Sequence, residues 1–246
     1  MSKETIVVTG ALKDGIGEAI TNTLLDSGFN VIGTYESDLK NKLGKIKSSS
    51  LQLHEVQHDD RKSLLEFANS IDIEINGLVN AEMFFNMEDI TSFDFDLWDK
   101  SIAINLTAPN VLIHSLKNKM QKGSSIVTIT SSEAFSGSFG ASAYVASKAA
   151  IHNLTKTHAN NLGSNNIRVN AIAPGWIGGV MDTDDVFNMS REITPLGRLG
   201  DPQEVANVTK FLLSKDSSFI TGSVLTVDGG YSCVDTISKF EFKAEQ

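Results

Sequence analysis

Short apolar runs alternate with longer amphipathic segments along the whole chain. The runs at 5–9 and 124–131 are dominated by β-branched residues, which favour strands. The segment 15–28 instead spaces Ile16, Ile20 and Leu24 so that they share one helical face. This pattern predicts strands at about 5–9, 30–35, 51–56, 77–80, 124–131, 166–172 and 223–227, and helices near 15–28, 37–46, 60–71, 95–120, 143–162 and 201–213.

The alternation of strands and helices indicates an α/β fold. Strands joined through helices run parallel with right-handed crossovers, and the helices cover both faces of the sheet. In such sheets ligands bind beyond the carboxyl ends of the strands, near the point where the strand order reverses. Gly10, Asn80, Ser131 and Pro174 lie at or beyond the ends of predicted strands, so we expect them to converge there.

Composition narrows the class of protein without identifying it. The 246 residues suit one large α/β domain or two small ones, but no linker or repeat divides them. The formal net charge of -9 argues against a nucleic acid or an anionic membrane surface as the main partner. The single Cys233 excludes an intrachain disulfide, and the histidines lack metal-ligand spacing, so we predict no metal site.

The first residues carry no export signal. Residues 1–5 lead directly into the first predicted strand, with no apolar segment long enough for a signal peptide or a membrane span. We therefore expect a cytoplasmic protein without a membrane partner.

Tyr144 and Lys148 form the most informative pair of polar residues. A Tyr four residues before a Lys on a helix places both side chains on one face. A nearby ammonium stabilises the phenolate and lowers the pKa of the phenol, which lets the Tyr act as an acid or base on an alcohol or carbonyl oxygen. The same spacing also occurs on many solvated helices, so the pair needs support from other residues.

Three other segments supply that support. Ser131 ends a β-branched run, where a hydroxyl can point into a crevice, and Asn105 lies in the helical segment that follows Trp98. Near the N-terminus, the apolar strand ends at Gly10, and Gly15 and Gly17 open the next helix. A glycine-rich turn between a strand and a helix cradles phosphate groups.

In this order and spacing, these residues resemble the short-chain dehydrogenase/reductase (SDR) family, from Ile6 to about Tyr231. Further matching segments are Gly77–Glu82, Ile167–Ile177, Pro195–Val205 and Phe219–Gly230. Members of the 3-oxoacyl-carrier-protein reductase type are the most similar. The resemblance implies a single-domain, doubly wound Rossmann fold over residues 1–246, with a seven-stranded parallel sheet.

The resemblance also implies hydride transfer between a nicotinamide cofactor and a ketone or secondary alcohol. It makes Tyr144 the acid/base, Lys148 the residue that lowers the Tyr144 pKa and binds ribose, Ser131 the substrate-oxygen ligand and Asn105 the organiser of the proton relay. A one-residue deletion in the loop would transfer the role of Ser131 to Ser132. The residues implied in cofactor binding are Gly10, Lys13, Asp14, Gly15, Ile16, Tyr35, Glu36, Gln57, Asn80, Ala81, Tyr144, Lys148, Pro174 and Ile177.

Two features depart from the family pattern. Four residues separate Gly10 from Gly15 where three are usual, and Glu82 replaces a glycine that lets the backbone approach the nicotinamide. Within the longer loop, Lys13 is either a phosphate ligand or a solvated charge, and Asp14 is either a ligand or a helix N-cap. Glu82 threatens cofactor affinity unless its side chain points away.

The end of the second strand bears on cofactor choice. An acidic side chain there accepts hydrogen bonds from ribose hydroxyls and repels a 2′-phosphate. Tyr35 occupies the usual Asp position and Glu36 follows it, so NAD(H) is favoured over NADP(H), which Lys13 keeps possible. Gln57 is placed to reach the adenine or is an ordinary exposed residue.

The resemblance further implies a substrate lid at about 178–194 and a homo-oligomer, a tetramer or a dimer, acting on a small keto or hydroxy compound. Two other functions stay open. One is a catalytically weak subunit that binds a dinucleotide or serves assembly, motivated by the long glycine loop and Glu82. The other is a non-redox isomerase or dehydratase that uses the same site.

Overall fold

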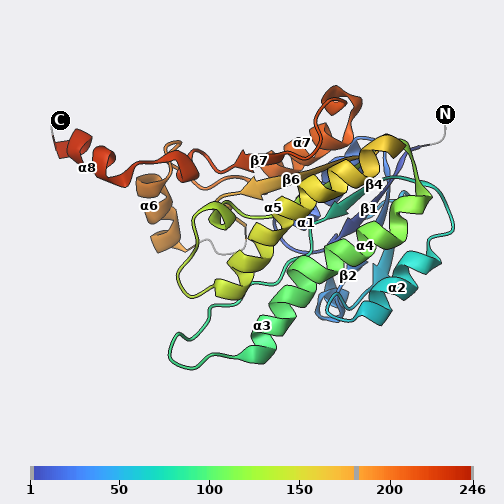
Figure 1. Cartoon of the computed structure of the whole chain (residues 1–246), viewed down its shortest axis with the longest axis horizontal. Coiled ribbons are helices and arrows are strands. Elements are labelled where there is room, and N and C mark those ends of the chain that lie inside the picture. Colours follow the sequence, from blue (N-terminus) through green and yellow to red (C-terminus); the bar gives the residue numbers. More distant parts are fainter. Residues whose placement is uncertain (1–2, 180–182, 245–246) are drawn as a thin grey trace.

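The computed structural model describes residues 3–179 and 183–244. In these residues seven strands form one parallel sheet with the order β3-β2-β1-β4-β5-β6-β7 (Figure 1). The strands are β1 (Thr5–Thr9), β2 (Asn30–Tyr35), β3 (Leu51–Glu55), β4 (Ile75–Asn80), β5 (Met120–Ile129), β6 (Arg168–Pro174) and β7 (Val224–Val227). The predicted seven-stranded parallel sheet is therefore confirmed.

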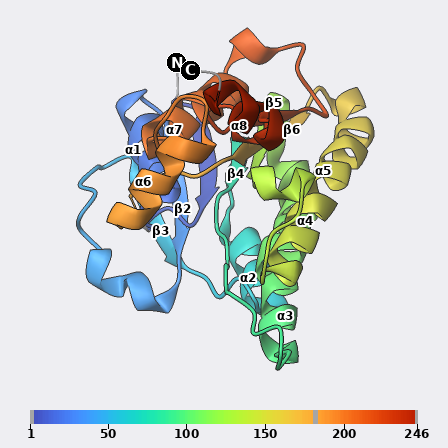
Figure 2. The ribbon, with the colours of Figure 1, turned by 90° about the vertical axis from the view of Figure 1, so that its left-hand side faces the viewer.

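Helices cover both faces of the sheet, as Figure 2 shows with the strands between the two layers. The helices are α1 (Ile16–Asp26), α2 (Arg61–Ser70), α3 (Phe95–Ile102), α4 (Ala108–Leu116), α5 (Ser142–Leu162), α6 (Asp184–Ile193), α7 (Pro202–Leu213) and α8 (Thr236–Ala244). One apolar core joins α2, α4 and α5 to the sheet, and the other joins α1 and α7 to it. Neighbouring strand residues such as Val7 and Val8 enter opposite cores, as the pleat requires.

The strand order reverses beside β1. The chain runs from β1 outward through β2 to β3, and then returns to place β4 on the other side of β1. The segments that leave β1 and β4 therefore diverge at the carboxyl edge and leave a crevice between them, which is where this class of sheet binds ligands. Gly10 leaves β1 and Ala81 leaves β4, so both border that crevice.

The α-helix predicted at 37–46 is wrong, because the chain forms a short 3-10 helix at Ser37–Lys42 instead. No side chain in that segment is buried. An α-helix in a protein is stabilised mainly by packing of an apolar face, which this polar segment lacks.

The helix predicted at 95–120 is interrupted in the middle. A π-helical turn at Ala103–Thr107 separates α3 from α4, and β5 begins earlier than predicted, at Met120. Pro109 has no backbone N–H for the carbonyl of Asn105, four residues earlier, and its ring crowds that carbonyl. The π turn contains Asn105 and ends two residues before this proline, a position where helices commonly depart from α geometry.

Two helices near the C-terminus were not predicted. α6 lies within the expected lid at 178–194, of which residues 180–182 fall outside the described part of the chain. α8 extends away from the sheet at one end of the molecule (Figure 1). No helix among the described residues is long and apolar enough to cross a membrane.

Candidate active site

Tyr144 and Ser131 meet beyond the carboxyl end of β5. Tyr144 lies in the first turn of α5, and Ser131 begins the 3-10 helix at Ser132–Phe135 that follows β5. The Ser131 hydroxyl lies close enough to the Tyr144 phenol to influence its ionisation, and the ring of Phe85 packs edge-on against the Tyr144 ring at 5.1 Å between centroids. Both hydroxyls are held in an enclosed, largely apolar setting, since Tyr144 and Ser131 are buried.

Burial raises the pKa of Tyr144 to about 12, while the nearby Ser131 hydroxyl acts to lower this pKa and the charge of Glu133 acts to raise it. The lowering of this pKa that the sequence led us to expect from Lys148 is not found in this arrangement. The Lys148 ammonium lies 5.6 Å from the Tyr144 ring centroid, and desolvation of the phenolate outweighs the other effects.

Lys148 lies one turn after Tyr144 and is almost fully buried. Its Nζ donates a hydrogen bond to the carbonyl of Ile129 at 3.0 Å. Burial lowers the pKa of Lys148 to about 7; the charge of Lys13 lowers it further and that of Glu82 opposes the shift. A lysine that loses its proton near neutral pH can take part in proton transfer, which a solvated lysine cannot.

Asn105 holds the segment after β4 in place. Its Oδ1 accepts from the backbone N–H of Phe84 at 2.8 Å, and its Nδ2 donates to the Phe84 carbonyl at 2.7 Å and to Ser101 at 3.1 Å. The side chain therefore ties the backbone at Phe84 to the π turn that contains Asn105.

Glu88 positions the start of α5, and the sequence analysis missed it. Its carboxylate accepts from the backbone N–H groups of Ser142 and Ala143 at 2.9 and 2.8 Å and from the Ser142 hydroxyl at 2.6 Å. A carboxylate at a helix N-terminus is stabilised there by free N–H groups and by the helix dipole. Because Glu88 is 54 residues from Ser142, no local pattern in the sequence links them.

The glycine turn after β1 brings backbones close together. Gly10 and Gly15 have φ angles of 66° and 79°, a region that favours glycine. A Cβ at Gly17 would lie 2.1 Å from the Gly10 carbonyl oxygen, so α1 packs directly on the turn. Gly15 caps α1 without a side-chain hydrogen bond, so the interpretation of Asp14 as the N-cap is wrong.

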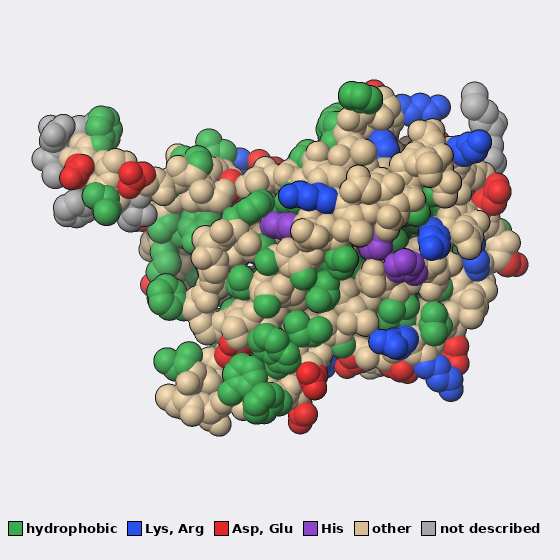
Figure 3. All heavy atoms as spheres, viewed as in Figure 1, with side chains coloured by type: hydrophobic (Ala, Val, Ile, Leu, Met, Phe, Trp, Pro, Cys, Tyr) green, Lys and Arg blue, Asp and Glu red, His purple; other side chains and the backbone are tan. Residues whose placement is uncertain are grey.

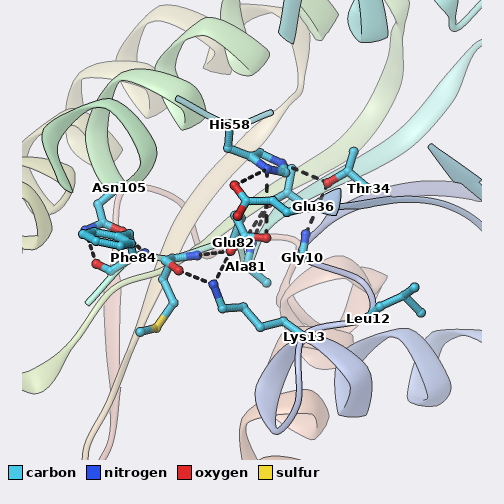
Figure 4. A network of polar contacts seen from close by, with 12 residues as sticks. Gly10, Leu12, Lys13, Thr34, Glu36, His58, Ala81, Glu82, Phe84 and Asn105 are labelled. Atoms are coloured by element: carbon cyan, nitrogen blue, oxygen red, sulfur yellow. Dashed lines mark hydrogen bonds and ion pairs between the residues drawn. The ribbon is translucent and has the colours of Figure 1, made fainter. Parts of the chain in front are cut away.

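An ion pair links the glycine turn to the segment after β4 (Figure 4). The Lys13 ammonium binds Glu82 Oε1 and the carbonyl of Met83. The Glu82 carboxylate also lies against Gly10, since its Oε2 would be 3.1 Å from a Cβ there. Glu82 therefore points under the glycine turn and into the protein.

His58 connects this ion pair to the end of β2. Its Nε2 shares a 3.0 Å hydrogen bond with the Thr34 hydroxyl, and its Nδ1 lies 3.5 Å from Glu36 Oε1 and 4.0 Å from Glu82 Oε2 (Figure 4). The His58 contact lowers the pKa of Glu36, although partial burial opposes the shift. The sequence analysis gave His58 no role, because only the fold brings the ends of β2, β3 and β4 together.

The remaining predicted cofactor residues border the same crevice or lie beside it. Gln57 is exposed, and Tyr35 is buried at the end of β2. Asp14 pairs with Lys42 at 2.5 Å, which lowers the Asp14 pKa. The others lie at the carboxyl ends of strands or after them. Asn80 ends β4, where its Nδ2 donates to Thr128 at 3.1 Å, and Pro174 ends β6. Ala81 follows β4, Ile16 begins α1, and Ile177 bridges to Gly200.

A cleft of ≈ 630 Å³ lies beside α6, between the segment after β6 and the start of α7. Its walls include Gly178, Phe187, Arg198 and Asp201. Apolar side chains also gather over α3 and the loop before it (Figure 3). There Phe93 packs on Phe95 and Trp98, while Phe85 reaches Tyr144, so only part of this aromatic group faces the site.

Comparison with known proteins agrees with this geometry. Residues 10–232 match a family model described as Enoyl-(Acyl carrier protein) reductase. The human protein Dehydrogenase/reductase SDR family member 4 is 33% identical over 244 residues, which cover 92% of this chain and 86% of that protein. The 3-oxoacyl-[acyl-carrier-protein] reductase FabG of Thermotoga maritima is 34% identical over 246 residues, with coverage of 91% and 96%.

Solved structures show the same fold. A 4-hydroxyisoleucine dehydrogenase complexed with NADH has a TM-score of 0.88 and 27% identity, with 95% of this chain and 100% of that chain covered. A blue fluorescent protein from a metagenomic library, in complex with NADPH, has a TM-score of 0.87 and 26% identity, with coverage of 93% and 97%. The chain therefore belongs to the short-chain dehydrogenase/reductase family and is an NAD(P)-dependent oxidoreductase that acts on CH–OH and C=O groups.

Proposed function

We propose that this protein interconverts a small or medium-sized ketone and its secondary alcohol, with Tyr144 as the acid/base. The observation that carries the proposal is that the fold brings the Ser131 hydroxyl to the Tyr144 phenol, with Lys148 buried one turn further along α5. Reduction of a carbonyl develops negative charge on its oxygen, which needs a hydrogen-bond donor and a proton in a water-poor site. Ser131 and Tyr144 offer both, and the low pKa of Lys148 allows it to pass the proton on.

The crevice also carries the features that a dinucleotide requires. The glycine turn leaves no room for side chains between the turn and α1, and the Oδ1 of Asn80, buried at the crevice, has no hydrogen-bond partner among the described residues. When bound, the nicotinamide dinucleotide supplies or accepts the hydride. We propose that Gly10, Gly15, Ile16, Asn80 and Ala81 hold it.

We further propose that NAD(H) is preferred to NADP(H). The carboxylate of Glu36, with its lowered pKa, is ionised at neutral pH and would repel a 2′-phosphate. Lys13 and Lys42 would attract that phosphate, but each is already paired with a carboxylate. Solved relatives include one bound to NADH and others bound to NADPH, so they leave the choice to these local charges.

The organisation of the chain is part of the same proposal. We propose one dinucleotide-binding domain over residues 1–246, with a lid at 178–194 that contains α6. A homotetramer or homodimer in the cytoplasm stays a prediction from the family resemblance. The exposed side chain of Phe219 and the outlying α8 are consistent with a partner subunit.

A catalytically weak subunit is the second candidate. The Lys13–Glu82 ion pair across the crevice favours it, because a dinucleotide has to displace that contact. An isomerase or dehydratase is the third candidate, since Tyr144, Ser131 and Lys148 could also move protons without net redox chemistry.

A titration of the purified protein with NADH and with NADPH, followed by nicotinamide fluorescence, tests these alternatives. A panel of ketones is then given to the wild type and to Tyr144→Phe, with the thermal unfolding midpoint as the control for folding. Ketone-dependent oxidation of NADH that falls about 10³-fold in the variant would support the proposal. Tight binding of NADH without turnover of any ketone would favour the weak subunit or the non-redox enzyme.

A further inference from the structure

The Lys13–Glu82 ion pair lies across the crevice between β1 and β4. Lys13 belongs to the turn after β1, whereas Glu82 and Met83, which it binds, follow β4. These two strands flank the point where the strand order reverses, and dinucleotides bind across the crevice at that point. The pair therefore joins the two walls that a dinucleotide has to lie between.

The two partners are buried to different degrees. The Lys13 side chain is 37% exposed to solvent, whereas the Glu82 side chain is only 4% exposed. Lys13 comes from a loop and can reach solvent or a ligand with little loss of packing. Glu82 is fixed, because its Oε1 also accepts from the Met83 N–H at 3.0 Å and its backbone N–H donates to Thr9 at 3.0 Å.

Lys13 neutralises the charge of Glu82, but two buried polar atoms around this ion pair lack hydrogen bonds. Glu82 Oε2 and His58 Nδ1 are both buried and have no hydrogen-bond partner among the described residues, although they lie 4.0 Å apart. When Lys13 turns away, the Glu82 carboxylate keeps His58 as a polar neighbour. Lys13 is thus the partner that can leave the ion pair and bind a ligand instead.

We propose that the Lys13–Glu82 pair is a strap that closes the dinucleotide crevice of the free protein, and that Glu82 sets dinucleotide affinity by competing with the cofactor phosphates for Lys13. This proposal rests on the proposed function, since it requires a dinucleotide in the crevice. A phosphate group in place of Glu82 offers Lys13 an equivalent charge-assisted hydrogen bond. Affinity then reflects the difference between the two contacts.

The experiment measures the Kd of NADH, by fluorescence, for the wild type, Glu82→Gln and Glu82→Gly. We expect Glu82→Gly to bind NADH about five- to tenfold more tightly, because it frees Lys13 and removes the side-chain volume beneath the glycine turn. Glu82→Gln keeps the volume and removes only the charge, so we expect a smaller tightening. Glu82 lies outside the left-handed region, so either residue suits its backbone.

The double variant Lys13→Met/Glu82→Gly tests the role of Lys13. We expect it to lose the gained affinity, and we expect NADH binding by Glu82→Gly to depend more steeply on salt than binding by the wild type. Lys62→Met and Glu66→Gln, which make the same charge changes in an exposed pair on α2, serve as matched controls and should leave the Kd unchanged. Thermal unfolding midpoints verify that each variant is folded.

Two results would overturn the strap. If both Glu82 variants bind NADH no more tightly than the wild type, Glu82 does not compete for Lys13. If the double variant keeps the whole gain, the effect comes from volume and not from Lys13. Absence of NADH binding in every variant would overturn the dinucleotide site together with the strap, whereas loss of turnover with intact NADH binding would contradict the proposed reaction alone.

Discussion

The two ends of the crevice are built from different interactions. The proposed catalytic end, formed by Ser131, Tyr144 and Lys148, combines two neutral hydroxyl groups with a buried lysine that donates to a backbone carbonyl. The binding end, around Lys13 and Glu82, uses charges that are paired with each other.

This difference has a physical consequence. Neutral hydroxyls need no charged partner when they are buried, so Ser131 and Tyr144 carry no ion pair that a ligand would have to break. Charged groups in a partly buried crevice need partners, because the desolvation of an unpaired charge is costly. The binding end therefore satisfies its own charges in the free protein, and a charged ligand has to exchange with them.

Among the substitutions that distinguish the two ends of the crevice, Ser131→Ala is expected to have the largest effect. Loss of a donor to the developing oxyanion should lower kcat/KM for a ketone by about 10²–10³-fold, with little change in the Kd of NADH. Steady-state kinetics and the fluorescence titration measure the two quantities. Ser132→Ala is the matched control, and an equal loss in that variant would show that the neighbouring serine carries the role.

Lys148→Met tests whether the lysine of the proposed catalytic end is desolvated, through the pH dependence of stability. The pKa of Lys148 falls from 10.5 in the unfolded chain to about 7 in the folded protein, so between these values the unfolded chain binds more protons. The free energy of unfolding of the wild type therefore rises as the pH increases from about 7 towards 10. Below pH 7, Lys148 is charged in both states, and the cost of burying its charge lowers the stability in full.

Lys148→Met lacks this dependence. Between pH 7 and pH 10 the stability difference between wild type and variant should shift by roughly 3–4 kcal/mol in favour of the wild type. Urea unfolding at a series of pH values measures it. A constant difference from pH 7 to pH 10 would mean that Lys148 is not desolvated in the folded protein.

Thr34→Val tests the binding end through its effect on the free energy of unfolding. Its hydroxyl shares a hydrogen bond with His58 Nε2 at 3.0 Å and accepts from the Gly10 N–H at 3.3 Å. Valine keeps the shape and leaves these groups unpaired, so we expect a loss of about 1–2 kcal/mol in the free energy of unfolding. An unchanged urea midpoint would show that water replaces the hydroxyl.

The smallest effect is expected from Asp14→Asn. Its pair with Lys42 is partly exposed, with 51% of the Asp14 side chain accessible, so solvent screens the interaction. We expect a loss below about 1 kcal/mol that disappears at high salt. Unfolding measured at low and high NaCl concentration checks this, and a large loss that persists in salt would place Asp14 in the buried network instead.

The catalytic end was largely accessible from the sequence. Tyr144 and Lys148 are one turn apart on one helix, and Ser131 ends a strongly β-branched run, so local periodicity indicates how they are presented. The sequence did not reveal that the pKa of Tyr144 is raised, because this shift depends on how completely the phenol is desolvated. The π turn at Ala103–Thr107 was hidden as well, although Pro109 marked its position.

The binding end needed the tertiary structure. Lys13, Glu36, His58 and Glu82 follow four different strands, and their side chains meet only because β1, β2, β3 and β4 are neighbours in the sheet. From the sequence, Lys13 could be a phosphate ligand or a solvated charge, and the structure shows a third arrangement in which it is paired with Glu82.

The sequence by itself determined the α/β class, the parallel sheet, and the presentation of Tyr144 and Lys148 on one helical face, since these follow from periodicities of a few residues. Only the tertiary structure decided how Glu82 points, which charges pair, and how far Tyr144 and Lys148 are desolvated. Burial and long-range pairing are properties of the whole packed molecule, because both depend on residues that lie far away along the chain.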